Sequence, residues 1–224
     1  MFKQLLSVFL ESRCEFCQRT TSDILCEYCW QKLASNQLRQ NDRLQLYQTQ
    51  AIFSWGLYDG QLKRAIALAK YEGKPEMAQV LGTLLGQAWQ ESKQSKLIKF
   101  PSQVTVVPIP LHSKKQRERG FNQAEVMARS FCQITGYKLN TQALIRVKET
   151  EAMFSLENLA ARAKNIQGAL QVGGKLPQYP VLLLDDIHTT GTTVQESIKV
   201  LQQKQIEVIG VAVVAKAGLT SVFI

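Results

Sequence analysis

The stretch Val181-Leu-Leu-Leu-Asp-Asp-Ile-His-Thr-Thr-Gly-Thr-Thr193 decides the fold. Its first four residues, 181–184, are apolar and too few for a helix, so they predict a buried strand. Two carboxylates follow, and then four threonines around one glycine. Beyond the stretch, Val194, Ile198 and Leu201 recur at helical spacing. The order of strand, acidic pair, hydroxyl-rich turn and helix predicts an α/β sheet with a ligand at the carboxyl end of this strand.

The acidic pair and the turn suit the two ends of a sugar phosphate. Backbone N–H groups at a helix start favour an anion, and glycine lets the backbone approach it closely. Asp185 and Asp186 would repel an anion, so they suit ribose hydroxyls or a metal ion beside it. An ordinary loop before a capped helix is the alternative, but it explains neither the adjacent aspartates nor the threonines. The predicted phosphate-binding residues are Thr189, Thr190, Gly191, Thr192 and Thr193.

This pattern resembles the phosphoribosyl-pyrophosphate (PRPP) loop of type I phosphoribosyltransferases. The resemblance implies a mostly parallel sheet flanked by helices, and PRPP bound together with Mg²⁺. It also implies that Asp185 and Asp186 serve catalysis by holding the ribose hydroxyls. In related transferases a lid closes over the reacting sugar. Here we expect it at about residues 147–163, with Arg162 reaching the pyrophosphate on closure.

Two CxxC pairs lie near the amino terminus, with eight residues between them. Four thiolates at this spacing can surround one tetrahedral zinc ion, and the segment is too short to fold without such help. Disulfides, which a reducing cytosol disfavours, and a redox CxxC are the alternatives. A site closed by four cysteines has no open position, so we expect the zinc to be structural. The predicted ligands are Cys14, Cys17, Cys26 and Cys29.

A second candidate site follows a predicted strand at residues 104–107. Two prolines stiffen the turn, and a basic run then leads into a predicted helix that Gly120-Phe-Asn-Gln123 opens. Taken alone, the basic run would indicate a solvated loop. Beside a second helix start, in a chain with a PRPP-like loop, it predicts a pyrophosphate site. The predicted residues are Pro108, Ile109, Pro110, Leu111, Lys114, Arg117 and Arg119.

The cysteine pairs, the Pro-Ile-Pro-Leu turn, the Arg-Gly-Phe-Asn-Gln segment and the PRPP-like loop together resemble the ComF family of competence-protein-F-like phosphoribosyltransferases. The resemblance covers nearly the whole chain and implies a link to DNA uptake and natural transformation. Lys70-Tyr71, Arg146 and Thr150 also match the family pattern. One position departs from it, because Met153 stands where the family has a glutamine. Methionine cannot hydrogen-bond as an amide does, which leaves the acceptor and the retention of catalysis open.

The length of 224 residues fits one ordinary domain with a small appendage. We expect a zinc module with an amino-terminal helix at residues 1–48 and a phosphoribosyltransferase-like domain at 49–224. The apolar runs are too short to span a membrane, and we expect a cytoplasmic protein. The net charge of +9 favours polyanionic partners, which include both PRPP and single-stranded DNA.

Three interpretations of function remain open at this point. The first is a phosphoribosyltransferase of unknown acceptor. The second is a non-catalytic scaffold that docks proteins of the competence machinery or binds single-stranded DNA, with an affinity for DNA that would fall steeply with salt. In the third, PRPP or a nucleotide is a regulatory ligand and the zinc module docks a partner. No general base is evident. His188 is interpreted as a spacer in the loop and His112 as a candidate substrate contact, while Lys63, Arg64 and Lys70 are interpreted as the solvated side of a helix.

Overall fold

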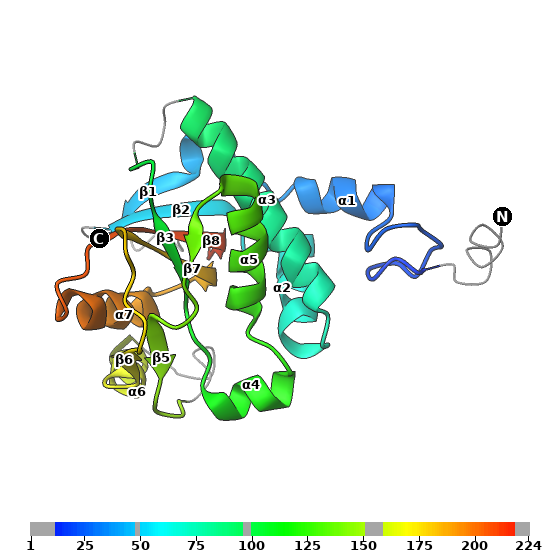
Figure 1. Ribbon diagram of the computed structural model, residues 1–224. Helices are drawn as coiled ribbons and strands as arrows, with labels where there is room; N and C mark the ends of the chain where they lie inside the picture. The colour runs from blue at the N-terminus through cyan, green and yellow to red at the C-terminus, as the bar shows by residue number, and fades with distance from the viewer. Residues whose placement is uncertain (1–11, 48–49, 96–99, 151–158, 218–224) are drawn as a thin grey trace, which may run out of the picture.

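The protein is described here by a computed structural model that covers residues 12–47, 50–95, 100–150 and 159–217. Its core is a six-stranded sheet in the order β1-β2-β8-β7-β3-β4 (Figure 1). The strand β1 is antiparallel to β2, and the other neighbours are parallel. The bounds are β1 Leu44–Tyr47, β2 Gln50–Leu57, β3 Thr105–Pro108, β4 Lys138–Leu139, β7 Val181–His188 and β8 Val208–Lys216.

Helices cover both faces of this sheet, as Figure 1 shows. The helices are α1 Glu27–Ala34, α2 Gly60–Tyr71, α3 Pro75–Gln94, α4 Ser113–Arg119, α5 Gln123–Thr135, α6 Leu159–Ile166 and α7 Thr192–Gln202. The helices α2, α3 and α5 pack on one face and α7 on the other. The predicted fold class, an α/β protein with a mostly parallel sheet flanked by helices, is therefore confirmed.

The strand β7 lies in the middle of the sheet and is buried on both faces. Leu182 and Leu184 belong to the apolar cluster beneath α3 and α5, whereas Val181 and Leu183 belong to the cluster beneath α7. Successive side chains of a strand point to opposite faces, so an unbroken apolar run is what such a strand requires. The strand is longer than the predicted residues 181–184 and ends at His188.

The cysteine-bearing segment packs against α2 rather than standing free of the sheet domain. Phe16 and Leu33 are buried in the same apolar cluster as Leu62 and Ile66 of α2. The guanidinium of Arg64 donates a 2.7 Å hydrogen bond to the carbonyl of Phe16 and lies over its ring. The boundary that we expect near residue 48 stays a prediction.

The stretch between α1 and β2, for which the sequence predicted only a connection, carries a 3-10 turn, η1 Gln40–Asp42, and the edge strand β1. A small antiparallel pair, β5 Leu144–Arg146 with β6 Leu170–Val172, lies near α4 and α6 below the main sheet in Figure 1. The predicted amino-terminal helix and Met153 lie outside the described residues. Within the described ranges, no helix is long and apolar enough to cross a membrane.

Candidate ribose-phosphate site

A cavity of about 270 Å³ opens where β7 and β3 end. The two strands are neighbours in the sheet, and the N–H of Ile109 continues their pairing with a 2.9 Å hydrogen bond to the carbonyl of Leu184. This pairing places the turn after β3 beside the acidic pair of β7. The cavity thus lies at the carboxyl ends of parallel strands, as predicted. Predicted residues that line it are Asp185, Asp186, Thr189, Gly191, Thr192, Thr193, Ile109, Pro110, Leu111 and Arg119.

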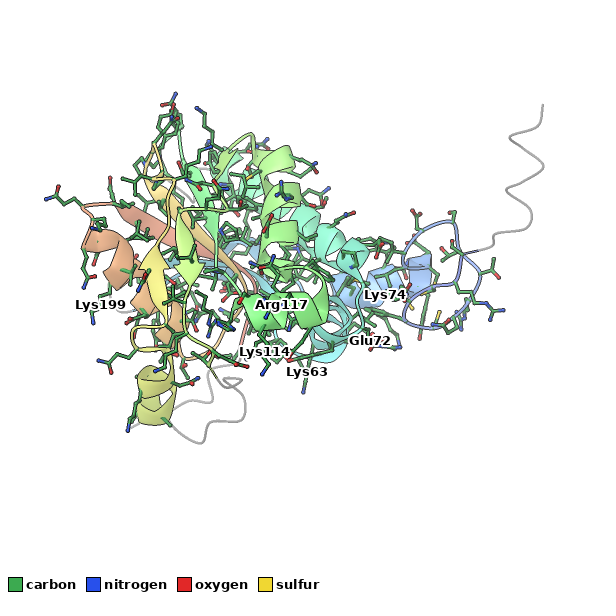
Figure 2. All side chains as sticks on the ribbon, turned by 60° about the horizontal axis from the view of Figure 1, so that its bottom comes forward. Lys63, Glu72, Lys74, Lys114, Arg117 and Lys199 are labelled. Atoms are coloured by element: carbon green, nitrogen blue, oxygen red, sulfur yellow. The ribbon has the colours of Figure 1, made fainter. Side chains whose placement is uncertain are left out.

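The basic run forms the helix α4, and its helical phase separates two pairs of cations. Lys115 and Arg119, four residues apart, line the cavity and are half-buried. Lys114 and Arg117 are exposed, and Figure 2 shows both on the outside of α4. The ammonium of Lys114 pairs at 2.9 Å with the carboxylate of Glu149. The sequence prediction placed Lys114, Arg117 and Arg119 in one pyrophosphate site and did not distinguish these two sides.

Three other predicted residues lie apart from the cavity lining or outside the described structure. Pro108 is the buried last residue of β3, and Thr190 takes part in the loop through its backbone. Arg162 belongs to α6, but its side chain lies outside the described part of the structure. The roles of all the predicted site residues stay predictions.

Asp186 is the most enclosed carboxylate of the cavity, with 3% of its surface exposed. Its Oδ1 pairs at 2.8 Å with Nζ of Lys70, and its Oδ2 accepts a 2.7 Å hydrogen bond from Nε2 of Gln123. The guanidinium of Arg119 donates in turn to Oε1 of Gln123. The sequence predicted that Lys70 lies on the solvated side of α2. That prediction is wrong, because the Lys70 ammonium neutralises a buried carboxylate.

The two adjacent aspartates differ in their charge environment. Burial, together with the charge of Asp186, raises the pKa of Asp185 to about 7. Burial alone would lower the pKa of Lys70, but the charge of Asp186, its hydrogen bond to Lys70 and the charge of Asp185 together outweigh this effect, so the pKa of Lys70 is raised. The Lys70 ammonium thus stays charged opposite Asp186. Asp185 can exchange a proton near neutral pH, and its Oδ1 accepts a 2.9 Å hydrogen bond from the N–H of Asp186.

Among the described residues, four cationic side chains line the cavity: Lys70, Lys115, Arg119 and Arg146. Lys115 donates a 2.7 Å hydrogen bond to the carbonyl of Thr150, and Arg146 donates to the Thr150 hydroxyl. Both charges are partly removed from water, and this burial lowers the pKa of Lys115 and of Arg146. In the described structure Nε of Arg146 is buried without a hydrogen-bond partner. A cavity lined by these cationic side chains favours a ligand with several negative charges.

The hydroxyl-rich loop leads directly into α7. Gly191 precedes the helix with φ of +69°, a left-handed conformation that glycine adopts readily. The Thr190 and Thr192 hydroxyl oxygens lie 3.4 Å apart. Thr192 and Thr193 form the first turn of α7, where N–H groups and the helix dipole favour an anion. The loop thus offers backbone and hydroxyl donors suited to a single phosphate group.

The two histidines have different surroundings in the structure. His188 is the buried last residue of β7, and its ring lies edge-on to Tyr47 at 4.9 Å between centroids. Burial lowers the pKa of His188, so the neutral imidazole is favoured. His112 caps α4, with its Nδ1 accepting from the N–H of Lys114 at 3.4 Å. The histidine interpreted as a spacer therefore borders the cavity, while His112 supports a helix.

The four sulphur atoms of Cys14, Cys17, Cys26 and Cys29 all lie within 4.8 Å of one another. A tetrahedral zinc ion with Zn–S bonds of about 2.3 Å separates its sulphur ligands by roughly 3.8 Å, so the cluster fits zinc. Burial and the neighbouring thiols raise the pKa of Cys29. Four thiolates this close together would repel one another without a cation between them. The four-cysteine arrangement that the sequence predicted is confirmed.

The site includes residues that were not predicted as site residues: Lys70, Lys115, Gln123, Arg146, Tyr58 and Tyr71. Lys70, Tyr71 and Arg146 matched the family pattern, which was the available signal. A helix over the basic run would have placed Lys115 on the same side as Arg119, because the two residues are four positions apart. Gln123 is the last residue of the Arg-Gly-Phe-Asn-Gln segment. Its partner Asp186 is 63 residues away, so only the fold reveals the contact.

Three curated relatives resemble this chain over most of its length. Competence protein F of Haemophilus influenzae is 28% identical over 72% of this chain and 71% of its own. Competence protein ComFC of Bacillus subtilis is 25% identical over 85% of this chain and 72% of its own length. DNA utilization protein YhgH of Salmonella typhimurium is 26% identical over 68% of this chain and 66% of its own length, so the match spans slightly under two thirds of that protein. These relatives confirm the resemblance to the ComF family.

No family model matches the chain. Among solved structures, UMP synthase of Leishmania donovani aligns with 69% of this chain and 24% of its own, at 17% identity and a TM-score of 0.34. The chain therefore spans about a quarter of that protein.

Proposed function

We propose that this protein binds PRPP with Mg²⁺ in the cavity and acts as a phosphoribosyltransferase that serves DNA uptake. One observation carries the proposal. The acidic pair of β7 and the hydroxyl-rich loop that follows this strand line one cavity together with Lys70, Lys115, Arg119 and Arg146. A sugar with a phosphate at one end and a pyrophosphate at the other complements this distribution of donors, carboxylates and cations.

In this proposal each part of PRPP has its own partners. The 5′-phosphate takes the N–H groups and hydroxyls of residues 189–193, and the ribose hydroxyls take Asp185 and Asp186. The pyrophosphate takes the turn after β3 together with Lys115 and Arg119, and Arg162 adds to it from the lid. The acceptor stays unassigned.

Transfer breaks the bond between C1 of the ribose and the pyrophosphate oxygen, which leaves with the electron pair while positive charge builds at C1. The cationic side chains stabilise the leaving pyrophosphate because they are fixed and partly withdrawn from water. Asp185 and Asp186 hold the ribose by its hydroxyls and place negative charge near C1. Lys70 and Gln123 keep Asp186 in one orientation. A nucleophilic acceptor then forms the new bond to C1.

Magnesium fits this site as a partner of the pyrophosphate. Mg²⁺ prefers oxygen ligands and is commonly bound through one or two carboxylates together with substrate phosphates. The carboxylate of Asp185 lines the cavity, whereas both oxygens of Asp186 are engaged by Lys70 and Gln123. When bound, the ion would neutralise charge on the leaving pyrophosphate. Asp185 is therefore the residue of the chain that would face it.

The link to DNA uptake rests on the relatives, whose names denote competence and DNA utilization. The net charge of +9 agrees with a polyanionic partner in addition to PRPP, and single-stranded DNA is such a partner. We further propose that residues 1–48 act as a structural zinc module and residues 49–224 as the transferase domain.

Calorimetry with PRPP·Mg²⁺ tests the proposal. We expect binding by the zinc-loaded wild type and loss of at least tenfold in affinity in Asp185→Asn/Asp186→Asn, which keeps the side-chain shapes. Glu125→Gln, on α5 and paired with Arg129 instead of lining the cavity, is the matched control. Pyrophosphate release with a panel of acceptors then tests catalysis. A folded wild type that does not bind PRPP would refute the proposal and leave a DNA-binding or partner-binding scaffold.

A further inference from the structure

The hydroxyl-rich loop is contacted by a residue that is distant from it in the sequence. Tyr47, the last residue of the edge strand β1, places its hydroxyl 3.3 Å from the carbonyl oxygen of Thr190, 143 positions further along the chain. Its ring lies edge-on to His188 at an interplanar angle of 74°. Tyr47 is not among the residues that line the cavity, so it contacts the loop from another side.

The space behind Gly191 is filled by the same two rings. A Cβ atom added at Gly191 would lie 3.0 Å from Nε2 of His188 and 3.2 Å from Cε1 of Tyr47. Both distances are shorter than ordinary carbon contacts. The loop therefore rests against Tyr47 and His188, and its close approach to them requires glycine at this position in addition to its positive φ.

The hydrogen bond to Thr190 orients the peptide that joins Thr190 to Gly191. This peptide is trans, and in a planar trans peptide the C=O and the following N–H point in opposite directions. When Tyr47 holds the Thr190 carbonyl on its own side, the Gly191 N–H is turned to the opposite side. Gly191 lines the cavity, so that side is where a phosphate would meet the loop.

We infer that Tyr47 is a positioning residue, which aims the Gly191 N–H at the 5′-phosphate through its hydrogen bond to Thr190. The inference rests on the proposed function, because it names the residue that shapes the phosphate part of the same site. The His188 ring supports the arrangement by fixing the Tyr47 ring. Tyr47 touches the loop and not the ligand, and it lies far outside the motif that identifies the loop.

The first test compares Tyr47→Phe with wild type for ribose 5-phosphate and for pyrophosphate·Mg²⁺ by calorimetry at one salt concentration. Loss of a single hydrogen bond that orients a donor should weaken ribose 5-phosphate binding about fivefold. Pyrophosphate affinity should stay the same, because its partners lie on α4 and the turn after β3. Tyr179→Phe is the matched control, since Tyr179 precedes β7 at the opposite end of the sheet.

The second test follows the Gly191 amide by NMR in ¹⁵N-glycine-labelled protein. The Gly191 amide resonance of the wild type should move on addition of ribose 5-phosphate, and Tyr47→Phe should reduce that movement. Equal ribose 5-phosphate affinity in Tyr47→Phe and wild type would overturn the inference and leave the proposed function intact. An unmoved Gly191 amide in a wild type that binds the ligand would do the same, whether or not the variant folds. A wild type that binds neither ligand would overturn both.

Discussion

The zinc module and the ribose-phosphate cavity are built in opposite ways. The four thiols of the module come from the short segment between Cys14 and Cys29, and residue spacing alone brings them together. The cavity instead collects residues from α2, α4, α5, β5, β7, the start of α7 and the loops after β2, β3 and β7. A site of the first kind needs a metal to fold, whereas one of the second kind needs the whole sheet to be in register. The two regions meet at α2, where Arg64 contacts Phe16 and Lys70 contacts Asp186.

Removal of zinc should break the first region with the largest effect. Structural zinc contributes roughly 10 kcal/mol of apparent binding free energy to modules of this kind, so chelation or Cys29→Ser should unfold the segment that carries α1. Phe16 and Leu33 would then leave the apolar cluster that they share with α2. Zinc content and urea denaturation measure the loss. Cys132→Ser, a cysteine outside the cluster, should retain zinc, and a zinc-free protein with an unchanged denaturation midpoint would contradict the prediction.

The pair of Lys70 and Asp186 tests the second region. Lys70→Met leaves a buried carboxylate without its partner, and we expect a loss of about 3–5 kcal/mol in the free energy of unfolding at pH 8. Lys70→Met/Asp186→Asn should recover much of that loss, because the uncompensated charge is gone. Lys63→Met, on the same helix, should change stability by less than about 0.5 kcal/mol. Equal losses in the single and double variants would show that packing, not charge, sets the stability.

The raised pKa of Asp185 predicts that the stability of the sheet domain depends on pH. The unfolded carboxyl has a pKa of about 3.9, and in the folded protein burial and Asp186 raise it to about 7. The folded state binds the proton more tightly, so the stability from the protonated carboxyl is present below pH 4 and is lost as the pH rises to 7.

Asp185→Asn removes this titration. It should therefore gain on the order of 2 kcal/mol relative to wild type between pH 4 and pH 8, after allowance for partial exposure. Urea denaturation across this range measures the difference. Asp23→Asn, which alters an exposed carboxyl in the cysteine-bearing segment, is the control variant. A difference between Asp185→Asn and wild type that does not change with pH would contradict the assignment.

The smallest effect concerns the helical phase of α4. Lys115→Gln should weaken pyrophosphate·Mg²⁺ binding about tenfold, because a charge-assisted contact is lost from the cavity. Lys114→Gln should leave the affinity within about twofold, because its ammonium faces outward to Glu149 and surface pairs contribute little. Calorimetry at constant ionic strength separates the two variants. Equal weakening by both would indicate that only the overall charge of the helix matters.

Sequence alone determined the parts of this protein whose physics is local. The unbroken apolar run before Asp185 requires a strand that is buried on both faces, and the turn after it must lie at a carboxyl end. The spacing of the cysteines brings four thiols together without the help of distant residues. Gly191 is needed for a backbone conformation that other residues rarely adopt. Each of these inferences depends on residues that are close along the chain.

Only the tertiary structure decided which distant side chains complete the site. Whether Lys70 faces water or Asp186 depends on how α2 packs against the sheet, and Lys115 is selected over Lys114 by the rotation of α4 about its axis. Tyr47 reaches Thr190 because the edge strand β1 pairs with β2 and not elsewhere. These contacts join residues that are far apart in sequence. Their geometry is set by packing, which no local pattern of residues encodes.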